Sequence, residues 1–124
     1  MAGRRLRPRA TAVLIREGRV LLTRDRGQRR YALPGGGIKR GEPTISAVAR
    51  ELHEELRMEL TQVTRLPKLD FDGMLNAHKV CLVEADGEPI LRRFEIEDFI
   101  WWDGKEEVPL FPHVAHILSR MQTE

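Results

Sequence analysis

The sequence lacks the features that mark several classes of protein. It contains one cysteine, Cys81, so no internal disulfide can form, and we expect a reducing, cytoplasmic location. No apolar run approaches the ~20 residues of a membrane-spanning helix, so we expect no such helix and no membrane as a partner. No apolar segment with a cleavage site follows the basic start, so we expect no signal peptide. Internal repeats and low-complexity segments are also lacking.

The chain also has little net charge, because its formal value is only +2. The four arginines at positions 4, 5, 7 and 9 already exceed that value, so the rest of the chain is nearly balanced. We therefore expect residues 1–9 to be a basic, flexible tail and residues 10–124 to form one domain. A solvated tail is the simpler interpretation; the alternative is an electrostatic arm for nucleic acid or a polyphosphate substrate.

The order of apolar patterns predicts an α+β, or mixed α/β, domain. Residues 11–15 and 20–22 are β-prone and flank Glu17-Gly18, which predicts a hairpin. Residues 31–33 predict a short strand that ends at Pro34 and a glycine loop. A helix should begin near Pro43, and residues 78–84 and 97–102 should be strands. A second helix should cover 113–121. The core-facing stripe of the first helix is predicted to contain Ile45, Val48, Ala49, Leu52 and Leu56.

Three carboxylates crowd one side of the first predicted helix. Glu51, Glu54 and Glu55 are spaced i, i+3 and i+4, so they share one helical turn and repel one another. A divalent cation would neutralise that repulsion, and hard oxygen ligands suit Mg²⁺ or Mn²⁺. Two adjacent glutamates alone usually mark a solvated face, but the preceding glycine loop and the full spacing favour a metal site.

The segment from residue 36 to residue 58 resembles the Nudix box of MutT-like Nudix hydrolases, G-x5-E-x7-R-E-U-x-E-E-x-G-U, where U is bulky and aliphatic. Gly36, Glu42, Arg50-Glu51 and Glu54-Glu55 fill its polar positions, and Leu52 and Met58 fill the bulky ones. One position departs, because Arg57 stands where the pattern has its last glycine. The lead-in at residues 31–36, and Glu95-Ile96 before Trp101, extend the likeness to most of the chain.

This resemblance implies an α/β/α sandwich with a mixed central sheet, in which the box forms a loop–helix–loop. It also implies hydrolysis, with divalent metal, of a nucleoside diphosphate linked to another group. Glu51, Glu54 and Glu55 are the expected metal ligands, and the carbonyl of Gly36 is a further candidate. The implied role of Arg50 is to orient the glutamates. Glu42 is expected to brace the loop against the helix.

The water-activating base is open between a box glutamate and a glutamate beyond the box. Glu95 is the outside candidate because of its spacing to Trp101, and Glu97 is second because a strand would place both on one face. The catalytic candidates are thus Glu51, Glu54, Glu95 and Arg50. Arg29, Arg30 and Gly37 are candidates for substrate binding, although a solvated loop is the default for arginines there.

Several other residues have simpler structural interpretations. Arg57 after a helix should cost about 1 kcal/mol in the left-handed conformation, or the turn takes another shape. Cys81 should be a core residue and His78 a packed histidine. We expect His113 and His116 to lie on the surface, because no third ligand accompanies them. Trp101 and Trp102 should point to opposite faces of a strand.

Three functions remain open at this stage. The first is a metal-dependent pyrophosphohydrolase that acts on a nucleotide derivative. The second is a non-catalytic module that keeps the fold and senses a nucleotide. The third is a hydrolase or binder of nucleic-acid ends that uses the arginine tail. A homodimer is a further expectation.

Overall fold

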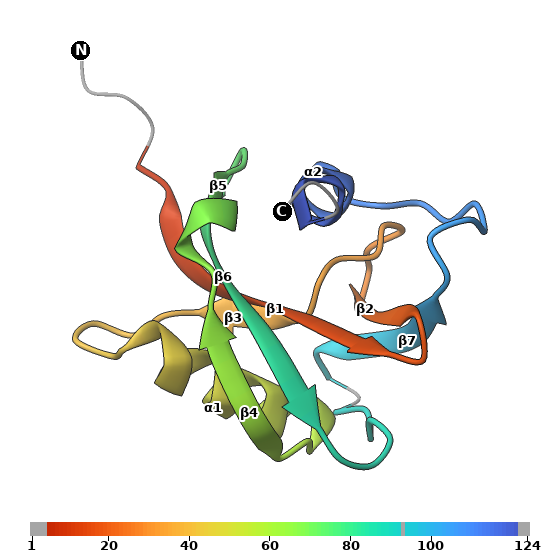
Figure 1. Ribbon diagram of the computed structural model, residues 1–124, viewed down its shortest axis with the longest axis horizontal. Helices are drawn as coiled ribbons and strands as arrows, with labels where there is room; N and C mark the ends of the chain where they lie inside the picture. The colour runs from red at the N-terminus through yellow and green to blue at the C-terminus, as the bar shows by residue number, and fades with distance from the viewer. Residues whose placement is uncertain (1–4, 93, 122–124) are drawn as a thin grey trace.

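The computed structural model describes residues 5–92 and 94–121 (Figure 1). Within them, one mixed sheet has the strand order β4-β6-β1-β2-β7, while β3 pairs with β1 and β5 with β6. The strands are β1 (Arg7–Arg16), β2 (Arg19–Asp25), β3 (Gly35–Gly37), β4 (Leu60–Arg65), β5 (Phe71–Asp72), β6 (Asn76–Ala85) and β7 (Ile96–Trp102). The helices are α1 (Thr44–Leu56), α2 (Pro112–Met121) and the short 3-10 helix η1 (Pro67–Leu69).

The two α-helices cover opposite faces of the sheet (Figure 1). Alternation along β1 explains this, because Leu14 packs in the cluster that contains Leu52 of α1, whereas Val13 packs with Val114 of α2. The mixed α/β architecture is therefore confirmed. No helix in the described part of the chain is long and apolar enough to traverse a bilayer.

The pairing of β1 positions the rest of the fold. β1 runs parallel to β6, from Arg7 opposite Asn76 to Leu14 opposite Val83, and antiparallel to β2 and β3. The predicted hairpin is confirmed, with Ile15 opposite Val20. The strand begins at Arg7, so residues 7–9 are paired strand residues and do not belong to a tail. Residues 1–4 of the predicted tail lie outside the described residues.

Two other local predictions need correction. Residues 31–33 make only isolated bridges, Thr23 with Ala32 and Tyr31 with Leu110, while the glycines expected in a loop form β3. The backbone of β3 pairs with β1 because a chain without side chains can lie close to that strand. In α1 the buried stripe contains Ala47 in addition to Val48, Leu52 and Leu56, whereas Ile45 is 47% exposed.

The end of α1 has the strained geometry that the sequence allowed. Arg57 has φ 54° and ψ 30°, which is the left-handed region. Its N–H donates to the carbonyl of His53 at 3.0 Å, and the N–H of Met58 donates to the carbonyl of Leu52 at 3.2 Å. The helix therefore ends as it would with a glycine at that position, although an arginine stands there.

Candidate active site

The glycine strand β3 lies against the carboxylate face of α1. A Cβ atom added at Gly36 would lie 2.0 Å from Oε2 of Glu51, whereas one added at Gly37 would meet nothing within 4 Å. Gly36 pairs with Ala10 of β1, so its backbone is fixed by the sheet. Glu51 can therefore occupy this place only because residue 36 has no side chain.

Arg50 connects the loop before α1 to the helix. Its guanidinium donates to Glu42 at 2.8 and 2.9 Å, to Oε1 of Glu51 at 2.8 Å and to Oε1 of Glu54 at 2.9 Å. It also donates to the carbonyl of Gly37 at 3.0 Å. The Arg50 guanidinium and the backbone N–H of Lys39 lower the pKa of Glu42 to about 2. Arg50 thus fixes the loop and two carboxylates of the helix at once.

Glu55 lies in the most anionic surroundings of this region. Burial is the main cause that raises its pKa to about 9, followed by the charges of Glu51 and Asp25, a hydrogen bond with Glu51, and the charge of Glu95. Glu95 comes close because its carbonyl accepts a hydrogen bond from the N–H of Arg26 at 2.9 Å. Carboxylates of α1, β2 and the segment before β7 therefore all add to the negative charge around Glu55.

Asp25 is the member of this group that the sequence did not reveal. It ends β2, and a shift of register between Arg24 and Asp25 places it opposite Ile96. Burial raises the pKa of Asp25, while the charge of Arg9 lowers it. No local motif marks Asp25, because its place depends on the pairing of β2 with β7, which are distant in sequence.

The carboxylates of this region are chemically suited to a divalent cation, but their present arrangement is not that of a metal centre. Carboxylate oxygens are the ligands that Mg²⁺ and Mn²⁺ prefer, and the absence of a side chain at Gly36 brings the Glu51 carboxylate close to the backbone of β3. Within residues 5–92 and 94–121, however, no three acidic, histidine or cysteine side chains converge as a metal centre. Glu51 and Glu54 face Arg50 instead.

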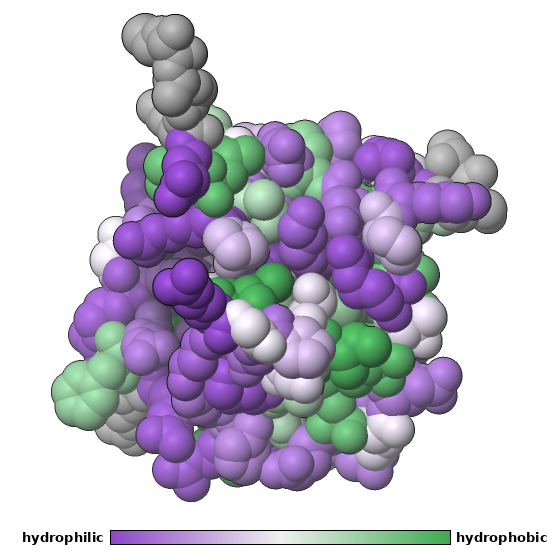
Figure 2. Space-filling view, turned by 90° about the vertical axis from the view of Figure 1, so that its left-hand side faces the viewer, coloured by the Kyte–Doolittle hydropathy of each residue, from purple (hydrophilic) through white to green (hydrophobic). Residues whose placement is uncertain are grey.

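The remaining site candidates are spread around this group. Glu97 forms an ion pair with Arg24 at 2.8 Å, so it does not share the surroundings of Glu95. Arg29 and Arg30 are exposed, and Arg30 lies 5.9 Å from the ring centre of Phe111. Hydrophilic side chains predominate on the face that carries the loop before α1 and the start of β1 (Figure 2).

A buried polar group lies on the α2 side of the sheet. His78 is 5% exposed and stacks on His113, which is 8% exposed, with ring centres 4.2 Å apart. The prediction for His78 is confirmed, but the prediction that His113 lies on the surface is wrong, because α2 turns this residue toward the sheet. His116 is exposed, as predicted, and stacks on Phe71.

The side chains predicted to be structural take the expected places. Cys81 is fully buried, and burial raises the pKa of its thiol, which makes it a poor nucleophile. Trp101 packs against the α1 cluster and Trp102 against the α2 cluster, so they point to opposite faces.

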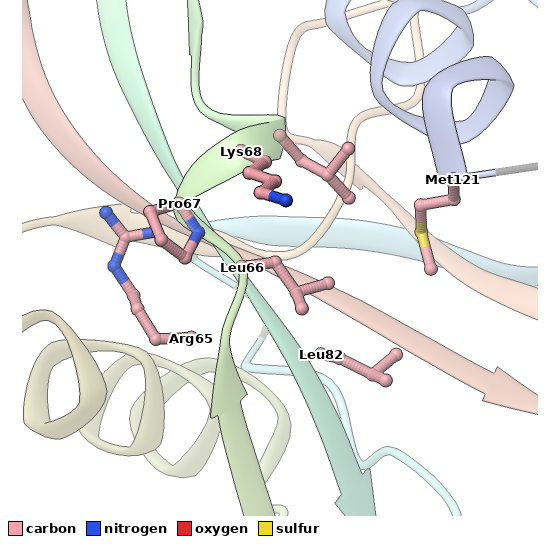
Figure 3. A pocket seen from close by; sticks show the side chains of 7 residues that line it. Arg65, Leu66, Pro67, Lys68, Leu82 and Met121 are labelled. Atoms are coloured by element: carbon pink, nitrogen blue, oxygen red, sulfur yellow. The ribbon is translucent and has the colours of Figure 1, made fainter. Parts of the chain in front are cut away.

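An apolar groove lies elsewhere in the described part of the molecule. A groove of about 360 Å³ lies between the end of β4, η1 and the end of α2, with Leu66, Leu82 and Met121 around it (Figure 3). Its lining is mostly apolar and contains no carboxylate. A phosphate-rich substrate would gain little there, so we place the candidate active site at the carboxylates.

The comparisons with known proteins decide the family. The model of the NUDIX domain matches residues 5–120. This chain belongs to the NUDIX family. Members are typically pyrophosphohydrolases that use divalent metals and act on nucleotide-derived substrates. No curated relative matches the chain.

Solved structures of NUDIX proteins superpose on most of the chain. A nudix hydrolase family member from Chromobacterium violaceum is 32% identical, with a TM-score of 0.82, over 98% of this chain and 80% of that one. A MutT NUDIX hydrolase from Burkholderia pseudomallei is 26% identical, with a TM-score of 0.79, over 94% and 98%. An ADP-ribose pyrophosphatase from Streptococcus suis is 18% identical, with a TM-score of 0.70 over 95% and 93%, and shares the fold.

Proposed function

We propose that this NUDIX protein hydrolyses a phosphoanhydride bond in a nucleoside diphosphate joined to another group, with the help of a divalent metal ion. The observation that carries the proposal is the set of carboxylates around Glu55, of which Glu51 lies directly against the glycine strand. Pyrophosphate is itself highly charged, so a site built from anions can bind it only through cations.

Glu51, Glu54, Glu55 and the carbonyl of Gly36 would hold Mg²⁺ or Mn²⁺. The metal would neutralise phosphoryl oxygens and acidify a bound water. The part of Arg50 is to position the carboxylates, because it contacts Glu42, Glu51 and Glu54 together. Phosphoryl transfer depends mostly on such positioning and on electrostatics, with little covalent help from the protein.

Among the outside glutamates, Glu95 is the better candidate for the base that takes a proton from the attacking water. Its charge acts on Glu55, whereas Glu97 is held in the ion pair with Arg24. Arg29, Arg30 and Gly37 remain proposals for substrate contact. Of these, Gly37 has a carbonyl that already accepts from Arg50, which leaves mainly its backbone N–H for a phosphate oxygen.

The test is a screen of phosphate release over nucleoside triphosphates, dinucleoside polyphosphates and ADP-ribose-type compounds, first with Mg²⁺ and then with Mn²⁺. We expect at least one compound to be hydrolysed, and the variants Glu54→Gln and Glu55→Gln to lose turnover by orders of magnitude. Glu106→Gln, which changes an exposed glutamate elsewhere, is the matched control and should keep full turnover.

Two results would contradict the proposal. Tight binding of a nucleotide without hydrolysis of any compound would favour the sensing module. Wild-type turnover in both glutamine variants would remove the assignment of the ligands. Salt-dependent binding of RNA or DNA ends would instead favour the third hypothesis.

A further inference from the structure

Arg9 is a largely buried cation whose observed side-chain hydrogen bonds go to neutral groups. It lies on β1, where its neighbours across the ladders are Gly37 of β3 and His78 of β6. Protein surrounds its guanidinium on nearly all sides, yet the residue keeps some solvent-exposed surface. Arg9 therefore lies deep in the molecule but within reach of the solvent.

The hydrogen bonds of Arg9 go to neutral groups. One terminal nitrogen donates to Oγ1 of Thr11 at 3.0 Å, and the other donates to the carbonyl of Leu33 at 3.0 Å. Among the described residues, no carboxylate forms an ion pair with it. A buried charge without a counter-ion costs free energy, and burial accordingly lowers the pKa of Arg9.

The polar groups behind Arg9 cannot supply the missing charge. Oγ1 of Thr11 lies 2.8 Å from Nδ1 of His78, and the N–H of Leu33 donates to Nε2 of His113 at 3.3 Å. Burial is the main cause that lowers the pKa of His78 to about 4 and that of His113 to about 3. Both rings are therefore neutral near pH 7 and supply no charge to the guanidinium.

Arg9 also lies near the candidate metal site, because it pairs with Gly37 of β3, whose carbonyl accepts a hydrogen bond from Arg50. The charges of Glu55, Asp25 and Glu51 all act on its guanidinium, although none of them touches it. The negative charges of these three carboxylates therefore act on a guanidinium that forms no ion pair with them within the described residues. A tetrahedral phosphate can use both, with some oxygens turned to a metal at the carboxylates and another turned to the arginine.

We propose that Arg9 binds a phosphate oxygen of the substrate from the side opposite the metal, as the fixed end of the polyphosphate site. This inference rests on the proposed function, since it names a further residue of the same site. An arginine suits the task because its donors are held in a rigid fork, and Thr11 and Leu33 hold two of its nitrogens in place.

The experiment compares Arg9→Gln with Arg7→Gln, which removes the same charge from the exposed start of the same strand. Binding of inorganic pyrophosphate is measured by titration calorimetry in the presence of Mg²⁺, and KM and kcat are measured on the compound found in the screen. We expect Arg9→Gln to weaken pyrophosphate binding and raise KM about tenfold or more, whereas Arg7→Gln stays within about twofold.

Thermal unfolding separates this role from a structural one. If Arg9 serves the substrate, Arg9→Gln should melt no lower than the wild type, because a buried unpaired cation disappears. Arg9→Lys should bind pyrophosphate more weakly than the wild type but better than Arg9→Gln. A folded Arg9→Gln protein with unchanged affinity and KM would overturn the proposal, and so would unchanged affinity in Arg9→Lys if Arg9→Gln does not fold.

The two proposals can fail separately. Hydrolysis by the wild type, together with unchanged pyrophosphate affinity and KM in Arg9→Gln, would reject only the phosphate contact. Pyrophosphate binding that depends on Arg9, without hydrolysis of any compound in the screen, would reject the enzymatic function and keep the anion site.

Discussion

At the scale of single residues, the closest fit in the site is between Gly36 and Glu51. The carboxylate of Glu51 occupies the place that any side chain at residue 36 would take. Because Arg50 also holds this carboxylate, Glu51 cannot move away without breaking a charge-assisted hydrogen bond.

We therefore expect Gly36→Ala to displace Glu51 and to lower kcat at least tenfold. Gly37→Ala leaves in place the backbone N–H proposed for substrate contact and should change kcat less than twofold. The two variants differ by one position in the same strand, and only the first creates a clash. Steady-state kinetics and circular dichroism on both variants check this. Equal activity of the two alanine variants would show that the fit at Gly36 has no catalytic importance.

Arg57 gives a second prediction for a single residue, this time for stability. Its positive φ is unfavourable for any residue with a Cβ atom, so Arg57→Gly should raise the free energy of unfolding by about 1 kcal/mol. Activity should stay largely intact, because no proposed ligand changes. Urea denaturation measures the gain.

Arg57→Ala is the control, since alanine shares the strain and should bring no comparable gain. A large loss of activity in Arg57→Gly would mean that Arg57 contacts the substrate.

At the scale of elements, α2 is held to the sheet partly through its histidine. His113 of α2 stacks on His78 of β6, and both have pKa values well below the ordinary value near 6.5. As the pH falls below about 6.5, these two histidines become protonated in the unfolded chain but stay neutral in the folded chain. The contribution of the two histidines to the free energy of unfolding is thus fully present above that pH and is lost as the pH falls toward about 4.

The loss should reach roughly 2 kcal/mol per histidine at pH 5. Urea denaturation at pH 7 and pH 5 measures it. His113→Phe keeps an aromatic ring but should reduce the dependence on pH by about half, because His78 keeps its share. The overall stability should also fall, because the N–H of Leu33 loses its acceptor. His53→Gln, an exposed change on α1, should keep the full dependence. Equal stability of the wild type at both pH values would contradict this account.

The elements were predictable where the pattern is local. The start of α1 near Pro43 and the hairpin at Glu17-Gly18 follow from proline, glycine and apolar spacing. The buried face of α1 was predicted less well, because Ala47 is small and its burial depends on how closely the helix approaches the sheet. His113 was misplaced for a related reason: its neighbour His78 comes from a distant strand.

The box residues of the candidate site were also predictable, because they are close in sequence. Asp25 and Arg9 were not, since they join the site only through a shifted register and a parallel pairing of distant strands. Such pairings follow from the whole fold, and no local pattern encodes them.

At the scale of the whole molecule, the start of β1 belongs to the folded domain. Arg7, Pro8 and Arg9 pair with residues 76–78 of β6, and Arg9 also pairs with Gly37. These residues therefore connect the glycine strand to the centre of the sheet.

A chain that begins at Arg7 should keep the stability of the full chain, whereas one that begins at Ala10 should lose about 2 kcal/mol or more, because it exposes the end of β6 and loosens β3. Thermal unfolding of the two truncated chains checks this. Equal melting temperatures would show that residues 7–9 contribute nothing to the fold.

The central claim is that the carboxylates of α1 hold a divalent cation beside the glycine strand. Titration calorimetry with Mn²⁺ tests it most directly, on the wild type and on the double variant Glu51→Gln, Glu55→Gln. We expect the wild type to bind the ion and the double variant to bind at least tenfold more weakly. Equal affinities in the two proteins, or no binding by the wild type, would contradict the claim.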